Sequence, residues 1–319
     1  MKPTCIESLH TEPESVDTKK DQRSHIIMSR VKLSREWFAT SLCCMTLLMS
    51  ACNSALEPLN ALTSSSAYDR RANLVYGDDP RQRMDLYRAR KRGDNTSTIV
   101  FVYGGAWRDG QRKDYAFMAQ SLASHGHDVL IPDYRLHPDV TWPAFIEDVA
   151  DAIKLLDTHA QEWLDRPLQR LVLMGHSSGA HTAAVLAGNA DRWLDNVGAE
   201  VVGLIGLAGP YDLPLDDPEV APVFPILEDP ISAIPVASVN EFHPPTLLIH
   251  GTSDTRVRPF HTENMATALQ QHAVKVDVEK LDGTGHGLAV ANFAAPLDLF
   301  SDEPETVKAW LSALDAATP

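Results

Sequence analysis

The sequence predicts an α/β fold in which a mostly parallel central sheet is covered by helices on both faces. From about Tyr68 onward, short apolar runs typical of strands alternate with longer segments that have helical spacing. Most of these runs are apolar throughout, as expected for strands buried on both faces of a parallel sheet. A chain of 319 residues, 44% of them hydrophobic, can bury such a core without disulfides or metal ions.

The expected strands are rich in β-branched and aromatic residues. Residues 98–103 read Thr-Ile-Val-Phe-Val-Tyr and run directly into a Gly-Gly pair, and residues 170–174 form a shorter buried run. Residues 274–281 alternate polar and apolar side chains, which is typical of a strand with one exposed face. In chain order, we expect strands at 82–89, 98–103, 128–134, 170–174, 201–207, 246–250 and 274–281.

Residues 142–163 form the longest expected helix, because Phe145, Val149, Ile153 and Leu156 recur on one face. The shorter expected helices lie at 114–124, 178–187, 261–271 and 303–314. Each of these helices follows an expected strand, which is the order that builds parallel strand pairs.

Residues 210–245 fit neither pattern. This segment is proline-rich and acidic, has no clear period, and is too long for an ordinary connection. It stands between two expected core strands. We therefore expect it to be a short lid-like or substrate-pocket insertion.

The N-terminal residues are expected to be an export signal. Residues 28–52 begin with basic side chains and continue into an apolar stretch, 37–49, that is too short to span a bilayer comfortably. The segment ends in Ser-Ala-Cys at Cys52, which resembles the lipobox of bacterial lipoproteins, although Met49 stands where leucine is commoner. The resemblance implies that Cys52 is lipidated and becomes the new N-terminus. A cleaved secretory signal with a chance cysteine is the alternative.

These features divide the chain into four parts. Residues 1–27 are an N-terminal extension of uncertain status, because Met28 is a plausible start, and residues 28–52 are the signal. Residues 53–66 are small and polar and are expected to be a flexible tether. Residues 67–319 are the folded domain, which we expect to be exported and anchored to a membrane through Cys52, on the periplasmic or cell-surface side.

Charge and cysteine content exclude several classes of function. The formal net charge is −15, and a surface this acidic repels phosphate backbones, so nucleic acid is not an expected partner. No cysteine follows Cys52, so the folded domain can hold neither a disulfide nor a cysteine nucleophile nor a zinc-thiolate site. We expect no metal and no cofactor.

Ser177 is the candidate nucleophile. It stands at the centre of Gly175-His176-Ser177-Ser178-Gly179, a G-x-S-x-G match that follows an expected strand and opens an expected helix. A sharp turn there lifts the serine above the sheet edge, and glycines are needed because neighbouring backbones come close. The helix N-terminus then directs free amides and its positive dipole end at a developing oxyanion. A structural serine turn is the alternative.

A serine hydroxyl needs a base, and the base needs an orienting acid. Asp254 follows the expected strand at 246–250, and His286 lies in a glycine-rich loop after the strand at 274–281. Both positions are at carboxyl ends of strands, where open α/β sheets place their sites. The order nucleophile, acid, base is the one that follows a G-x-S-x-G elbow. We therefore expect Asp254 to orient His286.

Other residues of the same types compete for these roles. Asp282, four residues before His286, ranks second as the acid, and Asp212 is a further alternative. His250 lies inside an expected strand and is expected to be structural. His176 adjoins the nucleophile and is expected to face away from it.

The third element of the site is the sequence Tyr103-Gly104-Gly105-Ala106-Trp107. Two glycines after a strand let backbone amides turn toward a substrate carbonyl. Together with the amide of Ser178, Gly104 and Gly105 are expected to form an oxyanion hole. A plain Gly-Gly turn is the alternative.

Taken together, the motifs resemble the carboxylesterase branch of the α/β-hydrolases that includes kynurenine formamidases and related small-ester hydrolases. The matching segments are 85–87, 104–107, 132–136, 175–179, 245–251 and 285–287. The resemblance implies the α/β-hydrolase fold and a serine hydrolase that cleaves small-acyl esters through an acyl-enzyme. The family usually has histidine before the Gly-Gly pair, whereas this chain has Tyr103, so the set of oxyanion donors is less defined.

Two other functions fit the same residues. Ester and amide hydrolysis share a tetrahedral intermediate, so an arylformamidase or another amide hydrolase could use the same triad. A hydrolase scaffold that has lost its activity and serves as a binding protein is the alternative from another class.

Overall fold

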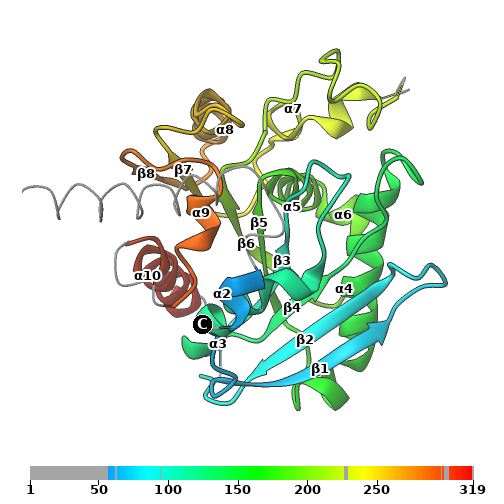
Figure 1. Cartoon of the computed structure of the whole chain (residues 1–319), viewed down its shortest axis with the longest axis vertical. Coiled ribbons are helices and arrows are strands. Elements are labelled where there is room, and N and C mark those ends of the chain that lie inside the picture. The colour runs from blue at the N-terminus through cyan, green and yellow to red at the C-terminus, as the bar shows by residue number, and fades with distance from the viewer. Residues whose placement is uncertain are drawn as a thin grey trace, which may run out of the picture. The chain divides into compact units, whose positions relative to one another are not determined.

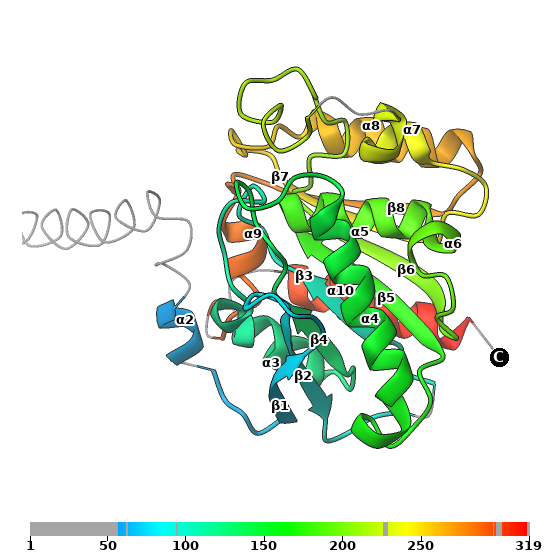
Figure 2. The same cartoon turned by 90° about the vertical axis from the view of Figure 1, so that its right-hand side faces the viewer.

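Eight strands form one sheet in the computed structural model, which describes residues 57–61, 63–93, 95–225, 229–295, 297 and 302–317 (Figures 1 and 2). All of these residues belong to the second of two units into which the chain divides, residues 51–319. The strands are β1 (Tyr68–Val75), β2 (Arg83–Ala89), β3 (Thr98–Val102), β4 (Val129–Pro132), β5 (Arg170–His176), β6 (Glu200–Leu207), β7 (Thr246–Gly251) and β8 (Val276–Leu281).

The strand order is β1-β2-β4-β3-β5-β6-β7-β8. Strand β2 pairs antiparallel with both β1 and β4, and every other pairing is parallel. All side chains of β3 and β7 are buried, as their continuous apolar runs predict. The expected mostly parallel α/β sheet is therefore confirmed.

Strand β1 was not expected from the sequence. After the buried Tyr68, the next five side chains are exposed, including Arg70 and Arg71. An edge strand with one neighbour needs no continuous apolar run, so its sequence lacks the signal by which the inner strands are recognised.

The helices lie on both faces of the sheet. Figure 1 shows α4 and α5 on one side and α3 and α10 on the other. The buried face of α4 contains Phe145, Val149, Ile153 and Leu156, as its periodicity predicts. The longer helices are α3 (Ala116–Ser124), α4 (Ala144–Trp163), α5 (Ser178–Gly188), α8 (Phe260–Gln271) and α10 (Glu303–Ala316). The short ones are α2 (Glu57–Ala61), η1 (Arg112–Tyr115), α6 (Ala190–Trp193), η2 (Pro230–Ala233), α7 (Pro235–Ser238) and α9 (Leu288–Ala291).

Strands β3 and β5 mark the point where the strand order reverses. The chain continues from β3 to β4 on one side of β3, whereas β5 pairs with β3 on the other side. Connections that leave in opposite directions open a crevice at the carboxyl ends of the two strands, where α/β sheets bind their ligands. The Gly-Gly pair follows β3 and Ser177 follows β5, so both lie at this switch point.

Part of the expected tether forms structure. Helix α2 lies within 53–66, and the Asn60 side chain donates to the carbonyl of Lys113 (2.8 Å) and accepts from the amide of Phe117 (3.1 Å). The expected extension, the signal and Cys52 lie outside the described residues. Within the described ranges, no helix is long and apolar enough to cross a membrane, and no cluster of side chains is suited to hold a metal ion.

Candidate active site

The turn between β5 and α5 places Ser177 in a strained conformation. Its φ of 55° and ψ of −126° are rarely adopted by a residue with a side chain. The amide of Ser177 donates to the carbonyl of Leu207 (2.9 Å), and its carbonyl accepts from the amide of Ala180 (2.9 Å). Backbone hydrogen bonds to β6 and to α5 thus hold the strained serine in place.

The two glycines of the motif are needed for backbone approach. A Cβ on Gly175 would lie 2.3 Å from the carbonyl oxygen of Gly179, and a Cβ on Gly179 would lie 2.0 Å from that of Val102. Glycine at 179 therefore lets α5 begin directly against β3, and glycine at 175 lets the end of β5 pass close to the first turn of α5. This contact places the start of α5 next to the Gly-Gly loop.

The structure brings Ser177, His286 and Asp254 together in one line of hydrogen bonds. Nε2 of His286 lies 2.8 Å from Oγ of Ser177, and Nδ1 lies 2.7 Å from Oδ2 of Asp254. A carboxylate can only accept, so Nδ1 carries the ring proton and Nε2 is free to accept from the serine hydroxyl. This is the arrangement required for a histidine base.

Asp254 is buried and fully hydrogen-bonded. Its Oδ1 accepts from the amides of Arg256 and Val257, both at 2.9 Å, and its Oδ2 faces Nδ1 of His286 and Nε2 of His250 (3.3 Å). Burial alone would raise the pKa of this carboxyl. The hydrogen bonds from the two histidines outweigh burial and hold the pKa below its usual range, so the group is a carboxylate at neutral pH.

The sequence did not indicate that His250 contacts Asp254. His250 lies in β7, as expected, but its Nε2 is within 2.9 Å of the Val257 carbonyl as well as facing Asp254. Both partners accept, so Nε2 carries the proton, and Nδ1 accepts from the hydroxyl of Thr262 (2.6 Å). A strand position predicts burial and gives no direction for the ring, so only the fold shows this contact.

The expectation that His176 faces away from the site was wrong. Its ring lies 4.8 Å from the ring of His286, and its Nε2 lies 3.1 Å from the His286 carbonyl. Burial, with the neighbouring His286, lowers the pKa of His176 to about 3, so the ring is neutral and Nε2 donates. His176 thereby supports the loop of the base from the nucleophile side.

Neither alternative acid contacts His286. The Asp212 carboxylate accepts from the side-chain amide of Asn264 (2.7 Å), and Asp282 is exposed on the loop that precedes His286. The two loops that carry Asp254 and His286 are themselves joined, because the amide of Ser253 donates to the Thr284 carbonyl (3.1 Å). This junction fixes the spacing between acid and base.

The Gly-Gly loop lies directly against Ser177. A Cβ on Gly104 would be 2.8 Å from Cβ of Ser177, so no larger residue fits there. Among the described residues, the amides of Gly104, Gly105 and Ser178 donate to no backbone carbonyl. Amides without an internal partner beside a nucleophile are what an oxyanion needs, so these three residues stay the candidate donors.

A family model described as BD-FAE matches residues 84–213, and the model of the prolyl oligopeptidase family matches residues 225–302. A kynurenine formamidase of Meyerozyma guilliermondii is 31% identical over 220 residues, which are 63% of this chain and 81% of that protein. The chain belongs to the α/β-hydrolase superfamily.

Other relatives have lower sequence identity to this chain, and the chain covers a smaller share of their length. Isoprenylcysteine alpha-carbonyl methylesterase of Arabidopsis thaliana is 27% identical over 270 residues (73% of this chain, 58% of that protein), and esterase LipC of Mycobacterium tuberculosis is 29% identical over 245 residues (69% and 60%). The chain spans 53 to 64% of the length of the first three curated relatives. A truncated carbohydrate esterase from gut microbiota matches the fold with a TM-score of 0.68 at 20% identity, over 80% of this chain and 99% of that one.

The segment between β6 and β7 packs beside the Gly-Gly loop and α5. Phe224 lies edge-on to Trp107 (4.9 Å between ring centres) and to His181 (5.5 Å, 75°). The carbonyl of Ala233 accepts from Nε2 of His181 (2.8 Å), and that of Val223 accepts from the amide of Trp142 (3.0 Å). His181 is one helical turn beyond Ser177, so these contacts lie beside the nucleophile.

Proposed function

We propose that the chain is a serine hydrolase that cleaves small-acyl carboxylic esters through an acyl-enzyme. The observation that carries the proposal is the hydrogen-bond line from Ser177 through His286 to Asp254, with heavy-atom distances of 2.8 and 2.7 Å. The names of the relatives support the reaction class, since methylesterases, an esterase and a formamidase all break an acyl bond.

The steps follow from the geometry. Oγ of Ser177 attacks the ester carbonyl carbon while Nε2 of His286 takes the hydroxyl proton. The carbonyl oxygen becomes an oxyanion, which the amides of Gly105 and Ser178 bind, with that of Gly104 nearby. His286 returns the proton to the leaving alcohol and the acyl group stays on Ser177. A water then attacks this ester, His286 accepts its proton, and the carboxylic acid leaves with Oγ protonated again.

Ionised Asp254 has two tasks in these steps. It keeps the proton of neutral His286 on Nδ1, and it stabilises the imidazolium that forms when Nε2 is protonated. The backbone amides on its Oδ1 keep the carboxylate from rotating. His250 holds the other side of Oδ2 in the same way.

The preference for small acyl groups is supported by the packing beside the nucleophile. Trp107, His181 and Phe224 are all at least 96% buried and contact one another. We infer that these rings fill space beside the Gly-Gly loop that a long acyl chain would need. Activity on a series of p-nitrophenyl esters should therefore fall as the acyl chain lengthens.

The direct test is turnover of p-nitrophenyl acetate by the wild type and by Ser177→Ala. Loss of the nucleophile should reduce kcat by roughly 10⁶. Ser124→Ala, an exposed serine at the end of α3, is the control and should retain wild-type rates. Equal rates for the wild type and Ser177→Ala would overturn the proposal.

Amide hydrolysis on the same residues is the second candidate. The formamidase of M. guilliermondii, 31% identical, favours it. Turnover of N-formylkynurenine, aryl acetates and acetylated sugars by one preparation would separate the two functions. A hydrolase-fold binding protein without activity, the third candidate, would show no turnover of any of them.

We also propose that Cys52 is lipidated and anchors the hydrolase domain to a membrane. The basic residues, the apolar stretch and the small residues before Cys52 support this. Fractionation of cells that express the wild type or Cys52→Ala tests it. The variant should leave the membrane fraction, and equal retention of both would contradict the proposal while leaving the hydrolase function untouched.

A further inference from the structure

The loop that carries the expected oxyanion donors is strained. Between β3 and η1, φ is positive at Gly105 (140°), Ala106 (52°), Trp107 (58°) and Gly110 (103°). Positive φ at a residue with a side chain is unfavourable and persists only where the surroundings enforce it. The loop's own bonds include those from the amides of Arg108 and Asp109 to the Gly105 carbonyl. These bonds close a turn but do not attach the loop to the sheet.

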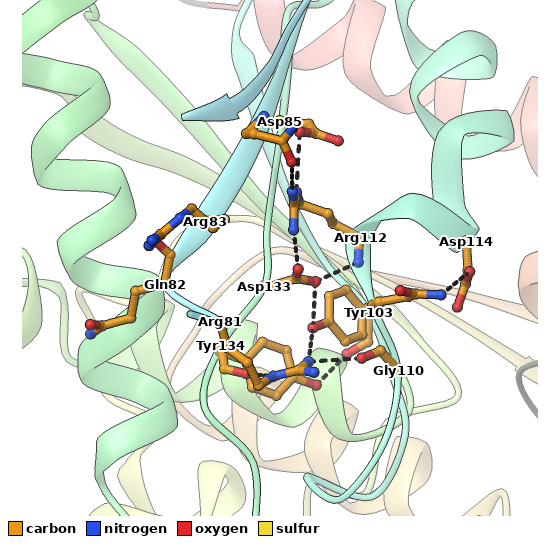
Figure 3. A network of polar contacts seen from close by, with 12 residues as sticks. Arg81, Gln82, Arg83, Asp85, Tyr103, Gly110, Arg112, Asp114, Asp133 and Tyr134 are labelled. Atoms are coloured by element: carbon orange, nitrogen blue, oxygen red, sulfur yellow. Dashed lines mark hydrogen bonds and ion pairs between the residues drawn. The ribbon is translucent and has the colours of Figure 1, made fainter. Parts of the chain in front are cut away.

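One guanidinium attaches both ends of the loop. Nη2 of Arg81, from the turn between β1 and β2, donates to the carbonyl of Gly110 (2.8 Å) and to Oη of Tyr103 (3.0 Å) (Figure 3). Its Nε donates to the Tyr134 carbonyl (2.7 Å), and Oη of Tyr134 donates to the Tyr103 carbonyl (2.9 Å). The residue before the Gly-Gly pair and the residue that ends the loop are therefore held by the same side chain.

The hydroxyl of Tyr103 links this guanidinium to the sheet. Arginine has only donors, so Oη of Tyr103 accepts from Arg81 and must donate to its other partner, Oδ1 of Asp133 (2.9 Å). Burial and the Asp133 charge raise the pKa of Tyr103 well above its usual range, so this hydroxyl keeps its proton. Asp133 directly follows β4, which is part of the rigid sheet.

The carboxylates of the network are all paired. Arg112 forms an ion pair with Asp133 and approaches Oδ1 of Asp85 in β2 at 3.1 Å, and Arg70 in β1 pairs with Oδ2 of Asp85. Tyr103, Asp133, Arg112 and Asp85 are each at most 6% exposed. A buried network in which both carboxylates are ion-paired is rigid, because moving one member leaves another unpaired.

The last residue of the loop, Gly110, packs against the ring of Tyr103. This ring stacks on Tyr134 at 4.8 Å and on Tyr115 at 5.5 Å between ring centres. A Cβ at Gly110 would lie 2.7 Å from the Tyr103 ring, so the loop backbone rests against it. Removal of the hydroxyl alone would keep this packing and break only the polar link.

We propose that Arg81 and Tyr103 are positioning residues that hold the oxyanion loop of the proposed esterase in its strained conformation. Neither touches the substrate; they act through the amides of Gly104 and Gly105. A shift of about 1 Å in a catalytic group can cost on the order of 10² in rate. The loss should fall on kcat, because the oxyanion exists only in the transition state and the tetrahedral intermediate.

The test compares Tyr103→Phe with Tyr76→Phe in the full chain. The Tyr76 hydroxyl donates to the backbone carbonyl of the same Asp133 but does not contact the loop, so its loss is a matched control. For p-nitrophenyl acetate, Tyr103→Phe should lower kcat by roughly 10- to 100-fold with KM within about threefold, while Tyr76→Phe keeps the wild-type kcat.

A boronic acid gives a readout that a merely structural role would not change. It forms a tetrahedral adduct with the serine, so its affinity for Tyr103→Phe should fall by the same factor as kcat. Arg81→Lys keeps one charge but cannot reach three acceptors at once, and should also lose kcat rather than KM. Wild-type kcat in either folded variant would overturn the proposal, as would an equal loss in Tyr76→Phe. If Ser177→Ala retained activity, the proposed function would fail instead.

Discussion

Replacement of Asp254 by asparagine is the sharpest single perturbation of the site, because it changes hydrogen-bond polarity and little else. The two amides on Oδ1, from Arg256 and Val257, require an acceptor there. The carbonyl oxygen of the new asparagine would take that position. Its NH₂ group would then face Nδ1 of His286 and Nε2 of His250, both of which carry protons in the wild type.

The magnitude follows from the tautomer. To meet an NH₂ group, Nδ1 of His286 must become an acceptor, so the proton moves to Nε2 and points at Oγ of Ser177. A histidine in this tautomer cannot take the hydroxyl proton. In the serine protease that serves as the general precedent, this change lowers kcat by about 10⁴, which corresponds to about 5.4 kcal/mol in the barrier.

The assay is steady-state hydrolysis of p-nitrophenyl acetate by Asp254→Asn, with Asp282→Asn as the matched control. Asp282 is exposed and does not contact His286, so its variant should retain the wild-type kcat. The KM of Asp254→Asn should change little, since the acid acts on the base and not on the bound ester. A loss below about tenfold in folded Asp254→Asn would refute the role of Asp254. A large loss in Asp282→Asn would transfer the role to that residue.

Three further predictions concern stability. Ser177→Gly should abolish activity but raise the free energy of unfolding by about 1 kcal/mol, because glycine tolerates a φ of 55°. Urea titration measures this change, and unchanged or lower stability would contradict the claim that Ser177 is strained. Gly179→Ala should prevent native folding, whereas Gly287→Ala, where a Cβ meets nothing within 4 Å, should fold normally by circular dichroism. Burial lowers the pKa of His176 to about 3 and of His181 to about 4, so the unfolded chain, with pKa values near 6.5, binds the extra protons. The free energy of unfolding should therefore fall as pH drops from about 6.5 toward 4, by up to about 1.4 kcal/mol per pH unit for each histidine, and a flat profile in that window would exclude this burial.

The inner part of the fold could be predicted because its sequence signals are strong. Strands β3 to β7 are close to the expected ranges, since strands covered on both faces need unbroken apolar runs, and the alternating pattern of 274–281 located β8. The edge strand β1 could not be predicted, because five successive side chains after Tyr68 are exposed and no apolar run remains. The four-residue helices α6, α7 and α9 are too short to show a period.

The candidate site divides in the same way. Motif and chain order suffice to select Ser177, Asp254 and His286, since each stands in the loop that the order requires. Side-chain direction does not follow from the sequence, which is why the expectation for His176 was wrong and why the contact of His250 with Asp254 was not foreseen. The link from Arg81 to the Gly-Gly loop joins segments more than 20 residues apart, and no local pattern indicates it.

In the proposed reaction, Ser177 carries the acyl group during turnover. Mass spectrometry of the full chain after treatment with a fluorophosphonate, followed by peptide mapping, tests it most directly, because only an activated serine reacts with this probe. We expect a single adduct per chain, on the peptide that contains Ser177, with loss of p-nitrophenyl acetate hydrolysis in proportion to labelling and no adduct on Ser177→Ala. Full hydrolysis with Ser177 unlabelled, or an adduct on another residue that alone accounts for the lost activity, would contradict it.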